Sequence, residues 1–176
     1  FQKIEQHKNS SNHFYVNNGD GTYTEKHIDV GINNHAYSLS ATVGDLNDDG
    51  YLDVYVANDF GMYDFVYIND KKGKFIDESL KAQRKSSINA MGSDIADFNN
   101  DGFKDIMVTD MDFEENYSWK TFLLSNPIEI MRTLQNAGYG AQNRRNLLHL
   151  KNEDGTFREK SRTDGLLPTD LSGVNA

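Results

Sequence analysis

The sequence contains no cysteine, only two prolines and no long apolar run. The absence of cysteine excludes disulfide bonds, thiolate metal sites and a cysteine nucleophile. Because no run approaches the roughly 18 apolar residues of a membrane helix, the sequence predicts no membrane span. Positive charge is also scarce, since 18 Lys and Arg stand against 27 Asp and Glu, for a net charge of −9. This excess of acid argues against nonspecific nucleic-acid binding, which needs a basic surface.

The remaining composition is that of a folded, mostly polar domain. The chain has 176 residues, 37% of them hydrophobic and 11% aromatic, with a mean hydropathy of −0.70. Aromatic side chains of this number can anchor a core. The length fits one ordinary domain, but it is short for a closed architecture of many blades.

Two acidic loops, 52 residues apart, are the most informative feature of the sequence. Residues 45–53 read DLNDDGYLD and residues 97–105 read DFNNDGFKD, and a β-branched run follows each loop. A turn element recurs as well, at residues 15–23, 67–75 and 149–157. Its last step is 82 residues rather than 52, which places an insertion of about thirty residues in the second unit.

The repeats predict one segment, residues 1–176, made of three units. These span approximately 13–66, 67–148 with an insertion at about 113–145, and 149–176, which is truncated. Short strands separated by Gly, Asn and Asp turns fill most of each unit. A period near fifty residues with several strands per unit is typical of a β-propeller blade. We therefore expect an all-β fold of about three propeller blades, a partial propeller, with one short helical insertion.

The helix is expected within the insertion. Asn126 and Pro127 form a typical helix start, with Asn as the N-cap and Pro at the first helical position. Ile128, Met131 and Leu134 follow at helical spacing, and Gly138 is placed to end the helix.

Each acidic loop follows the pattern D-x-N-x-D-G-x-x-D, which collects hard oxygen donors around one point. Side-chain oxygens at positions 1, 3 and 5, the carbonyl at position 7 and the carboxylate at position 9 form a shell suited to Ca²⁺. Glycine at position 6 allows the sharp turn. The predicted ligands of two calcium sites are Asp45, Asn47, Asp49, Tyr51 and Asp53 in the first loop, and Asp97, Asn99, Asp101, Phe103 and Asp105 in the second.

Three other interpretations of the loops are weaker. An EF-hand needs Glu at position 12, where this sequence has Val56 and Val108. Metal-free Asx turns would explain one loop, but two matching loops at a fixed offset favour a metal. A glycosidase carboxylate pair is less consistent with carboxylates inside metal-type loops. Asp48 is expected to point out of the shell, because Asn100 takes its place in the second loop.

These loops resemble the FG-GAP/VCBS repeat family, the calcium-binding blades of integrin α-chain propellers and of many bacterial surface proteins. Further similarity is to a bacterial subgroup associated with ASPIC/UnbV domains, and it involves residues 17–23, 56–59, 91–97, 136–146 and 152–157. The resemblance implies a propeller of about seven blades. Since three units cannot close a ring, and residues 171–176 align with 91–96 just before a loop, we expect this chain to be part of a longer chain or assembly.

The insertion is the candidate for partner binding, because it carries aromatic and arginine residues of the kind that anchor glycans or proteins. These are Tyr117, Trp119, Tyr139, Arg144 and Arg145. The alternative, that the helix only packs against a blade, is favoured. The five histidines, at positions 7, 13, 27, 35 and 149, show no metal-ligand spacing with a fixed carboxylate and are expected at the surface or in turns.

The function that fits these features is a calcium-stabilised binding or scaffold module outside the cytoplasm, secreted or on a bacterial surface, with a glycan or protein partner. No nucleophile with its base is visible, so an enzyme is not expected. Two alternatives remain open. In the first, the chain is a catalytic or non-catalytic part of a surface enzyme that acts on polysaccharides. In the second, it is a structural subunit of a larger surface assembly.

Overall fold

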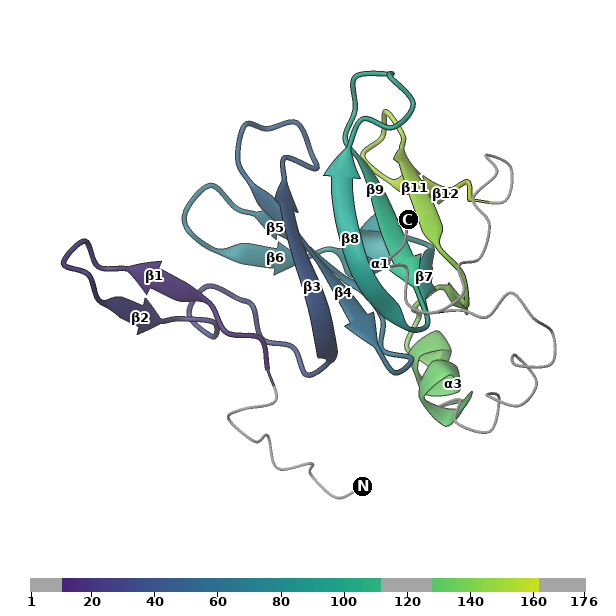
Figure 1. Cartoon of the computed structure of the whole chain (residues 1–176), viewed down its shortest axis with the longest axis horizontal. Coiled ribbons are helices and arrows are strands. Elements are labelled where there is room, and N and C mark those ends of the chain that lie inside the picture. Colours follow the sequence, from purple (N-terminus) through teal and green to yellow (C-terminus); the bar gives the residue numbers. More distant parts are fainter. Residues whose placement is uncertain (1–10, 112–127, 162–176) are drawn as a thin grey trace.

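Antiparallel β-strands dominate the structure, as the sequence predicts. A computed structural model describes residues 11–111 and 128–161. Their strands form two four-stranded sheets, a separate hairpin and a two-stranded pair (Figure 1). No helix in these described ranges is long and apolar enough to cross a membrane.

The first four-stranded sheet is a meander in which neighbouring strands are also consecutive in the chain. Its order is β3-β4-β5-β6, with bounds Tyr37–Gly44, Asp53–Asp59, Phe65–Asn69 and Phe75–Asp77. The apolar run in β4 is buried on both faces, which explains why hydrophobic and polar residues do not alternate there. β3 is an edge strand with an exposed apolar face, where Tyr37, Leu39 and Val43 are more than half exposed.

The second sheet repeats this plan. Its order is β8-β9-β11-β12, with bounds Ala90–Ala96, Asp105–Asp110, Leu147–Lys151 and Phe157–Glu159. β3 and β8 lie side by side (Figure 1), and the Thr42 hydroxyl donates to the Ser93 carbonyl at 2.8 Å. The two sheets are therefore stacked like neighbouring propeller blades, which confirms the predicted all-β blade repeats. The boundaries of the sheets differ from those of the predicted repeat units. The first unit ends at residue 66 and the second begins at residue 67, and both residues lie in β5 of the first sheet.

The core lies between the two sheets. Tyr55 and Ala57 on β4 pack in one cluster with Ile106 and Val108 on β9. A second cluster covers the other face of the first sheet, where Val30 and Ile32 pack against Val56, Phe65 and Tyr67. The central strands β4 and β5 of the first sheet are thus buried between the second sheet and the loop that precedes β3.

The hairpin turns confirm the predicted turn repeat. The outer hairpin of the first unit consists of β1 (Tyr15–Asn17) and β2 (Tyr23–Glu25). Backbone hydrogen bonds close the three turns in the same way, from Asn18 to Thr22 at 3.0 Å, from Asp70 to Lys74 at 2.8 Å and from Asn152 to Thr156 at 2.8 Å. The first two turns also share a positive φ at their second residue, at Gly19 and Lys71, whereas the third has an additional bond from the Gly155 N–H to the Asn152 carbonyl at 3.0 Å.

The predicted helix is present as α3 (Ile128–Asn136), and its end is explained by Gly138. The Gly138 N–H bonds the Gln135 carbonyl and the Tyr139 N–H bonds the Leu134 carbonyl, both at 3.0 Å. Gly138 has φ +94°, so the two bonds form a Schellman motif that glycine favours. The predicted start at Asn126 and Pro127 lies outside the described residues.

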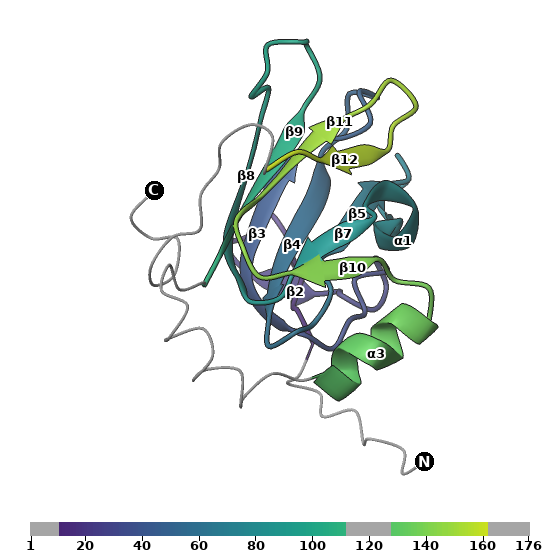
Figure 2. The ribbon, with the colours of Figure 1, turned by 90° about the vertical axis from the view of Figure 1, so that its right-hand side faces the viewer.

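Three small elements were not predicted. A one-turn helix, α1 (Ser79–Ala82), follows β6, and the carboxylate of Asp77 accepts the Ser79 N–H at 2.9 Å at its start. β7 (Lys85–Ser87) and β10 (Ala141–Asn143) pair in parallel beside α3 (Figure 2). Three-residue strands carry too little periodicity for detection, and their pairing partner is remote in sequence.

Candidate functional site

Each acidic loop connects the first two strands of its sheet. The first loop joins β3 to β4, and the second joins β8 to β9 at the same place in the second sheet (Figure 1). Equivalent sequences thus occupy equivalent positions at one end of both sheets.

In the first loop, side-chain oxygens hold the backbone in a tight curl. The Asp45 carboxylate accepts the N–H of Asp49 at 3.0 Å and of Gly50 at 2.9 Å. The Asp49 carboxylate accepts the Tyr51 N–H at 2.9 Å. Asp48 and Gly50 adopt positive φ angles of 59° and 85°, which is why glycine is needed at the sixth position.

The second loop has the same hydrogen bonds. Asp97 accepts the N–H of Asp101 at 3.1 Å and of Gly102 at 2.9 Å. Asp101 in turn accepts the Phe103 N–H at 2.9 Å. Asn100 takes the positive φ of 59° that Asp48 has in the first loop. The shared residue pattern therefore specifies one backbone geometry.

The aspartate at the ninth position ties each loop to the outer hairpin of its sheet. The buried Asp53 carboxylate accepts the Leu46 N–H and the Asn69 N–H, both at 2.8 Å. Burial raises the pKa of Asp53, and the charges of Asp49 and Asp45 add to that rise against the two backbone hydrogen bonds. A cation in the loop would therefore relieve an unfavourable charge.

Asp105 has the same role in the second sheet. It is fully buried and accepts the N–H of Phe98 at 3.0 Å and of Lys151 at 2.9 Å. Both ninth-position aspartates are thus structural acceptors as well as predicted metal ligands.

Two lysines contact the first loop. Lys71 lies 3.2 Å from the Asp49 carboxylate. Burial opposes the charge of Asp49, but the Tyr51 N–H, Asn47 and Lys71 outweigh it and lower its pKa. Asp48 forms an ion pair with Lys151 of the second sheet, so its side chain is engaged outside the loop, as expected.

The donor set of each loop suits Ca²⁺, since it consists only of carboxylate, amide and carbonyl oxygens. The side chains are turned toward backbone N–H groups, and the three carboxylates of either loop do not converge within 4.8 Å. Each carboxylate oxygen that accepts one N–H keeps a second lone pair. Binding Ca²⁺ thus requires side-chain rotation inside a backbone curl that already exists.

The candidate partner-binding residues within the described ranges have different surroundings. Tyr139 packs on Tyr63 with ring centroids 4.8 Å apart. Arg145 forms an ion pair with Glu159 at 2.8 Å and is only 17% exposed. Arg144 is adjacent to it in the segment before β11. Tyr117 and Trp119 lie outside the described residues.

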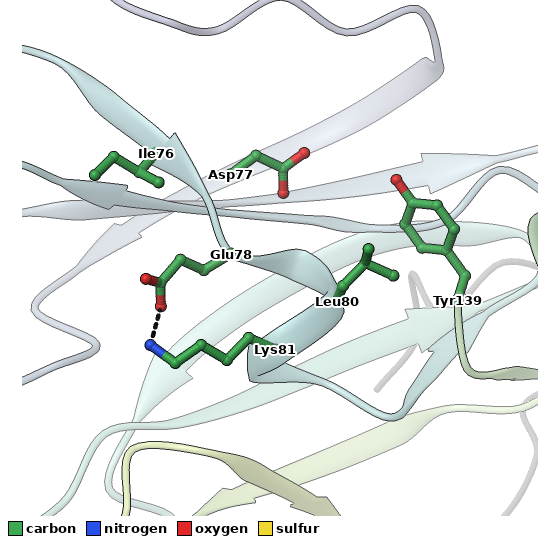
Figure 3. Close-up of a pocket in the computed structure, with 6 residues that line it drawn as sticks. All are labelled: Ile76, Asp77, Glu78, Leu80, Lys81 and Tyr139. Carbon is green, nitrogen blue, oxygen red and sulfur yellow. Dashed lines mark hydrogen bonds and ion pairs between the residues drawn. The ribbon is translucent and has the colours of Figure 1, made fainter. Parts of the chain in front are cut away.

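Tyr139 lines a surface hollow of about 310 Å³ that the sequence did not indicate. Figure 3 shows it between the end of β6, α1 and the segment after α3. Glu78 and Lys81 form an ion pair at 2.9 Å on one side of it. Among the residues that the structure describes, the lining is Ile76, Asp77, Glu78, Leu80, Lys81 and Tyr139. An aromatic ring, aliphatic side chains and charges of both signs thus meet here.

The expectation that the histidines lie at the surface or in turns is wrong for His149, which lies in β11. His27 lies in a turn, as expected, but its side chain is buried. His27 is 6% exposed and His149 is 1% exposed. Burial lowers the pKa of His149 to about 4, so the ring is neutral at pH 7. His13 and His35 are exposed, and His7 lies outside the described residues.

A fixed carboxylate partner for histidine also exists, contrary to expectation. His13, Glu25 and His27 place one ligand atom each within 4.8 Å of one another. The register of the hairpin accounts for this group, because residues equidistant from a turn face each other across a hairpin. Extending the turn element at residues 15–23 into a register would have placed His13 opposite His27.

A family model for the FG-GAP-like repeat matches residues 6–56 and 45–108 of the chain. The boundary between the two matched repeats falls on the first acidic loop. None of the curated proteins that were compared matches the chain significantly. The family match does not extend to the ASPIC/UnbV subgroup, which stays a prediction. With two loops of one geometry, two sheets of one plan and two matched repeats, the chain belongs to the FG-GAP-like repeat family.

Proposed function

We propose that this chain is a calcium-stabilised binding module that works outside the cytoplasm and presents a surface to a glycan or protein partner. The observation that carries the proposal is the identical hydrogen-bonded geometry of the two acidic loops. Repeats of this family generally act as non-catalytic, propeller-like binding or scaffold modules, which supports the same function.

Calcium has a structural role in this proposal. The residues that would hold it are Asp45, Asn47, Asp49, Tyr51 and Asp53, with Asp97, Asn99, Asp101, Phe103 and Asp105 in the second loop. The ion supplies positive charge where several carboxylates crowd together. At a calcium concentration one hundred times Kd, each site adds about 2.7 kcal/mol to the free energy of unfolding. Extracellular modules bind calcium with Kd near 10⁻⁴ to 10⁻³ M, so the loops suit a compartment rich in calcium.

Thermal unfolding in millimolar calcium, in EDTA and in magnesium tests the calcium sites. We expect calcium alone to raise Tm by several degrees, since about 1 kcal/mol shifts Tm by roughly 2–4 °C in a domain of this size. Asp49→Asn and Asp101→Asn keep an acceptor oxygen but remove a charge, so each should abolish about half of the gain. Asp20→Asn removes one carboxylate from a hairpin turn and serves as the matched control.

Equal Tm values in calcium and EDTA would show that the loops are metal-free turns. The same rise in magnesium would show that the sites do not select calcium. An Asp49→Asn variant that loses as much stability in EDTA as in calcium would assign that residue to the fold alone.

The hollow beside Tyr139 is the proposed partner surface, with a glycan as the ligand that fits it. Aromatic rings stack on the apolar faces of sugars, and the neighbouring carboxylates accept hydrogen bonds from hydroxyl groups. Tyr139→Ala should weaken binding to any oligosaccharide that the chain retains from a mixed panel by tenfold or more. Tyr37→Ala, at an exposed aromatic residue on β3, is the control and should bind normally.

The same panel separates the alternatives. Saturable binding without shortening of the sugar supports a binding module, whereas release of shorter products would indicate an enzyme. Equal binding by the Tyr139→Ala and Tyr37→Ala variants would remove the hollow as the site.

A further inference from the structure

The hairpin formed by β1 and β2 brings two histidines and a carboxylate to one face. In its register Tyr15 lies opposite Glu25, and the Lys26 N–H bonds the Phe14 carbonyl at 2.7 Å. One further step along this register places His13 opposite His27. Side chains at every second residue share a face, so His13, Glu25 and His27 project together.

Their distances agree with this register. The His13 Nδ1 atom lies 3.7 Å from Glu25 Oε1, and the His27 Nδ1 atom contacts the same oxygen. The two imidazole rings are 5.5 Å apart between centroids, in an edge-on arrangement. One ligand atom from each of the three side chains falls within a single 4.8 Å group.

We infer that His13, Glu25 and His27 bind a divalent transition-metal ion of the zinc class. Two imidazole nitrogens and one carboxylate oxygen are ligands that Zn²⁺ prefers, whereas the all-oxygen acidic loops suit Ca²⁺. Three protein ligands leave one position of a tetrahedron for water or an external donor. The site is independent of the calcium loops in both chemistry and location.

The surroundings of His27 hold its ring in the orientation that a metal ligand needs. The ring is buried, and its other nitrogen, Nε2, lies 3.2 Å from the Ser11 hydroxyl. A histidine that binds a metal through one nitrogen usually hydrogen-bonds through the other, which fixes the ring. The His27 backbone N–H also donates to Glu25 at 3.1 Å and so positions the carboxylate.

Two of the three side chains can be reached from solvent. The side chains of Glu25 and His13 are about one third exposed, which leaves an approach from solvent.

The other units of the chain retain the carboxylate but not the histidines. Asp77 accepts the Ser79 N–H at 2.9 Å, and Glu159 accepts the Ser161 N–H at 2.8 Å, at the positions of Glu25 and His27. The positions that correspond to His13 hold Phe65 and Leu147. All three units therefore share the hydrogen bond from a backbone N–H to the carboxylate two residues before it. The units without histidine at these positions fold in the same way, so the fold of the repeat requires neither histidine. Both departures from the repeat introduce a metal ligand beside the same carboxylate.

The repeats supply substitutions for the test that are compatible with the fold. His13→Phe and His27→Ser each install the residue of the second unit, and Glu25→Gln keeps an acceptor for the His27 N–H while removing the charge. His35→Ser changes an exposed histidine elsewhere and is the control. Zn²⁺ is titrated calorimetrically into the whole 176-residue chain in millimolar calcium, which supplies the ion proposed for the acidic loops.

We expect one equivalent of Zn²⁺ to bind at micromolar concentration. The three site variants should each lose at least about tenfold in affinity, the scale seen when a supporting group of a metal site is removed. The control should bind as the parent does. Co²⁺ in place of Zn²⁺ should give the strong visible absorption of a low-symmetry, four-coordinate ion, and His27→Ser should abolish it.

Zinc affinity that is unchanged in the His13→Phe and His27→Ser variants, or no uptake at micromolar zinc, would overturn the inference. Circular dichroism checks that each variant is folded. If His27→Ser does not fold, the test rests on His13→Phe, because the His13 side chain is partly exposed. Asp49→Asn and Asp101→Asn should leave zinc affinity unchanged, so failure of the calcium proposal and failure of this one give different results.

Discussion

At the scale of single residues, two fully buried ionisable groups make stability depend on pH in opposite directions. Burial lowers the pKa of His149 to about 4 and raises the pKa of Asp64 to about 6. Asp64 is held by the hydroxyls of Tyr55 and Ser86 and by the Asn58 N–H. The protonated Asp64 adds to the free energy of unfolding below pH 4, and this addition is lost as pH rises toward 6. The His149 contribution is present above pH 6.5 and is lost as pH falls toward 4.

His149→Phe should remove the second of these effects. The lowering of the His149 pKa from 6.5 to about 4 corresponds to roughly 3 kcal/mol of unfolding free energy at most. The parent loses this free energy at low pH, because its unfolded chain takes up a proton that the folded chain does not. Tyr67 fills the equivalent place in the first sheet, so an aromatic ring is compatible with it. Urea unfolding at pH 7 and pH 5 should show a smaller drop for the variant than for the parent. Equal drops would contradict the assignment, and His35→Gln, outside the core, is the control.

At the scale of elements, the ninth-position aspartates join each loop to a hairpin that is remote in sequence. Asp53→Ala leaves the N–H groups of the buried Leu46 and of the half-buried Asn69 without an acceptor. Since each such group costs about 1–3 kcal/mol, we expect a loss of roughly 2–5 kcal/mol in urea unfolding, with or without calcium. Asp49→Asn differs, because its effect is expected only in calcium.

Asp53→Asn provides the matched comparison. Its remaining oxygen can still accept one of the two N–H groups, so it should lose less stability than Asp53→Ala in EDTA. A loss confined to calcium would show that Asp53 acts only as a metal ligand. Asp105→Ala should behave as Asp53→Ala does.

The elements themselves were largely predictable from the sequence. The turn element at residues 15–23 and 149–157 and the glycine at 138 predicted turns and a helix end, because positive φ angles constrain the residue type. The acidic loops were recognisable for the same reason. α1 and the parallel pairing of β7 with β10 were not predicted, because they depend on tertiary contacts between very short segments.

The candidate site was predicted only in part. The spacing of the loop residues is visible in the sequence, but the backbone N–H partners of Asp53 and Asp105 depend on hairpins that follow 16 and 46 residues later. The group of His13, Glu25 and His27 was not predicted, because strand register rather than sequence spacing brings its members together. Burial of His149 follows from the stacking of sheets, which no local pattern encodes.

At the scale of the whole molecule, an ion pair links the first loop to the second sheet. The Lys151 side chain is 3% exposed, pairs with Asp48 and lies 5.4 Å from the centre of the Phe103 ring. Asp48→Ala leaves a nearly buried ammonium group without its carboxylate, whereas Lys151→Met replaces it with an apolar chain of similar length.

We expect Asp48→Ala to be the more destabilising of the two by about 1 kcal/mol or more. Urea unfolding of both variants at pH 7 measures the difference. A Lys151→Met variant that is less stable than Asp48→Ala would show that the ion pair, rather than relief of a buried charge, holds the loop to the sheet.

The two aspartate tethers also bear on the order in which the sheets form. The bond from Asp53 to Asn69 closes 16 residues of chain, whereas the bond from Asp105 to Lys151 closes 46, because the insertion lies between them. Loop-closure entropy makes the second closure costlier by about 1 kcal/mol. The first sheet should therefore assemble earlier and serve as a template on which the second condenses.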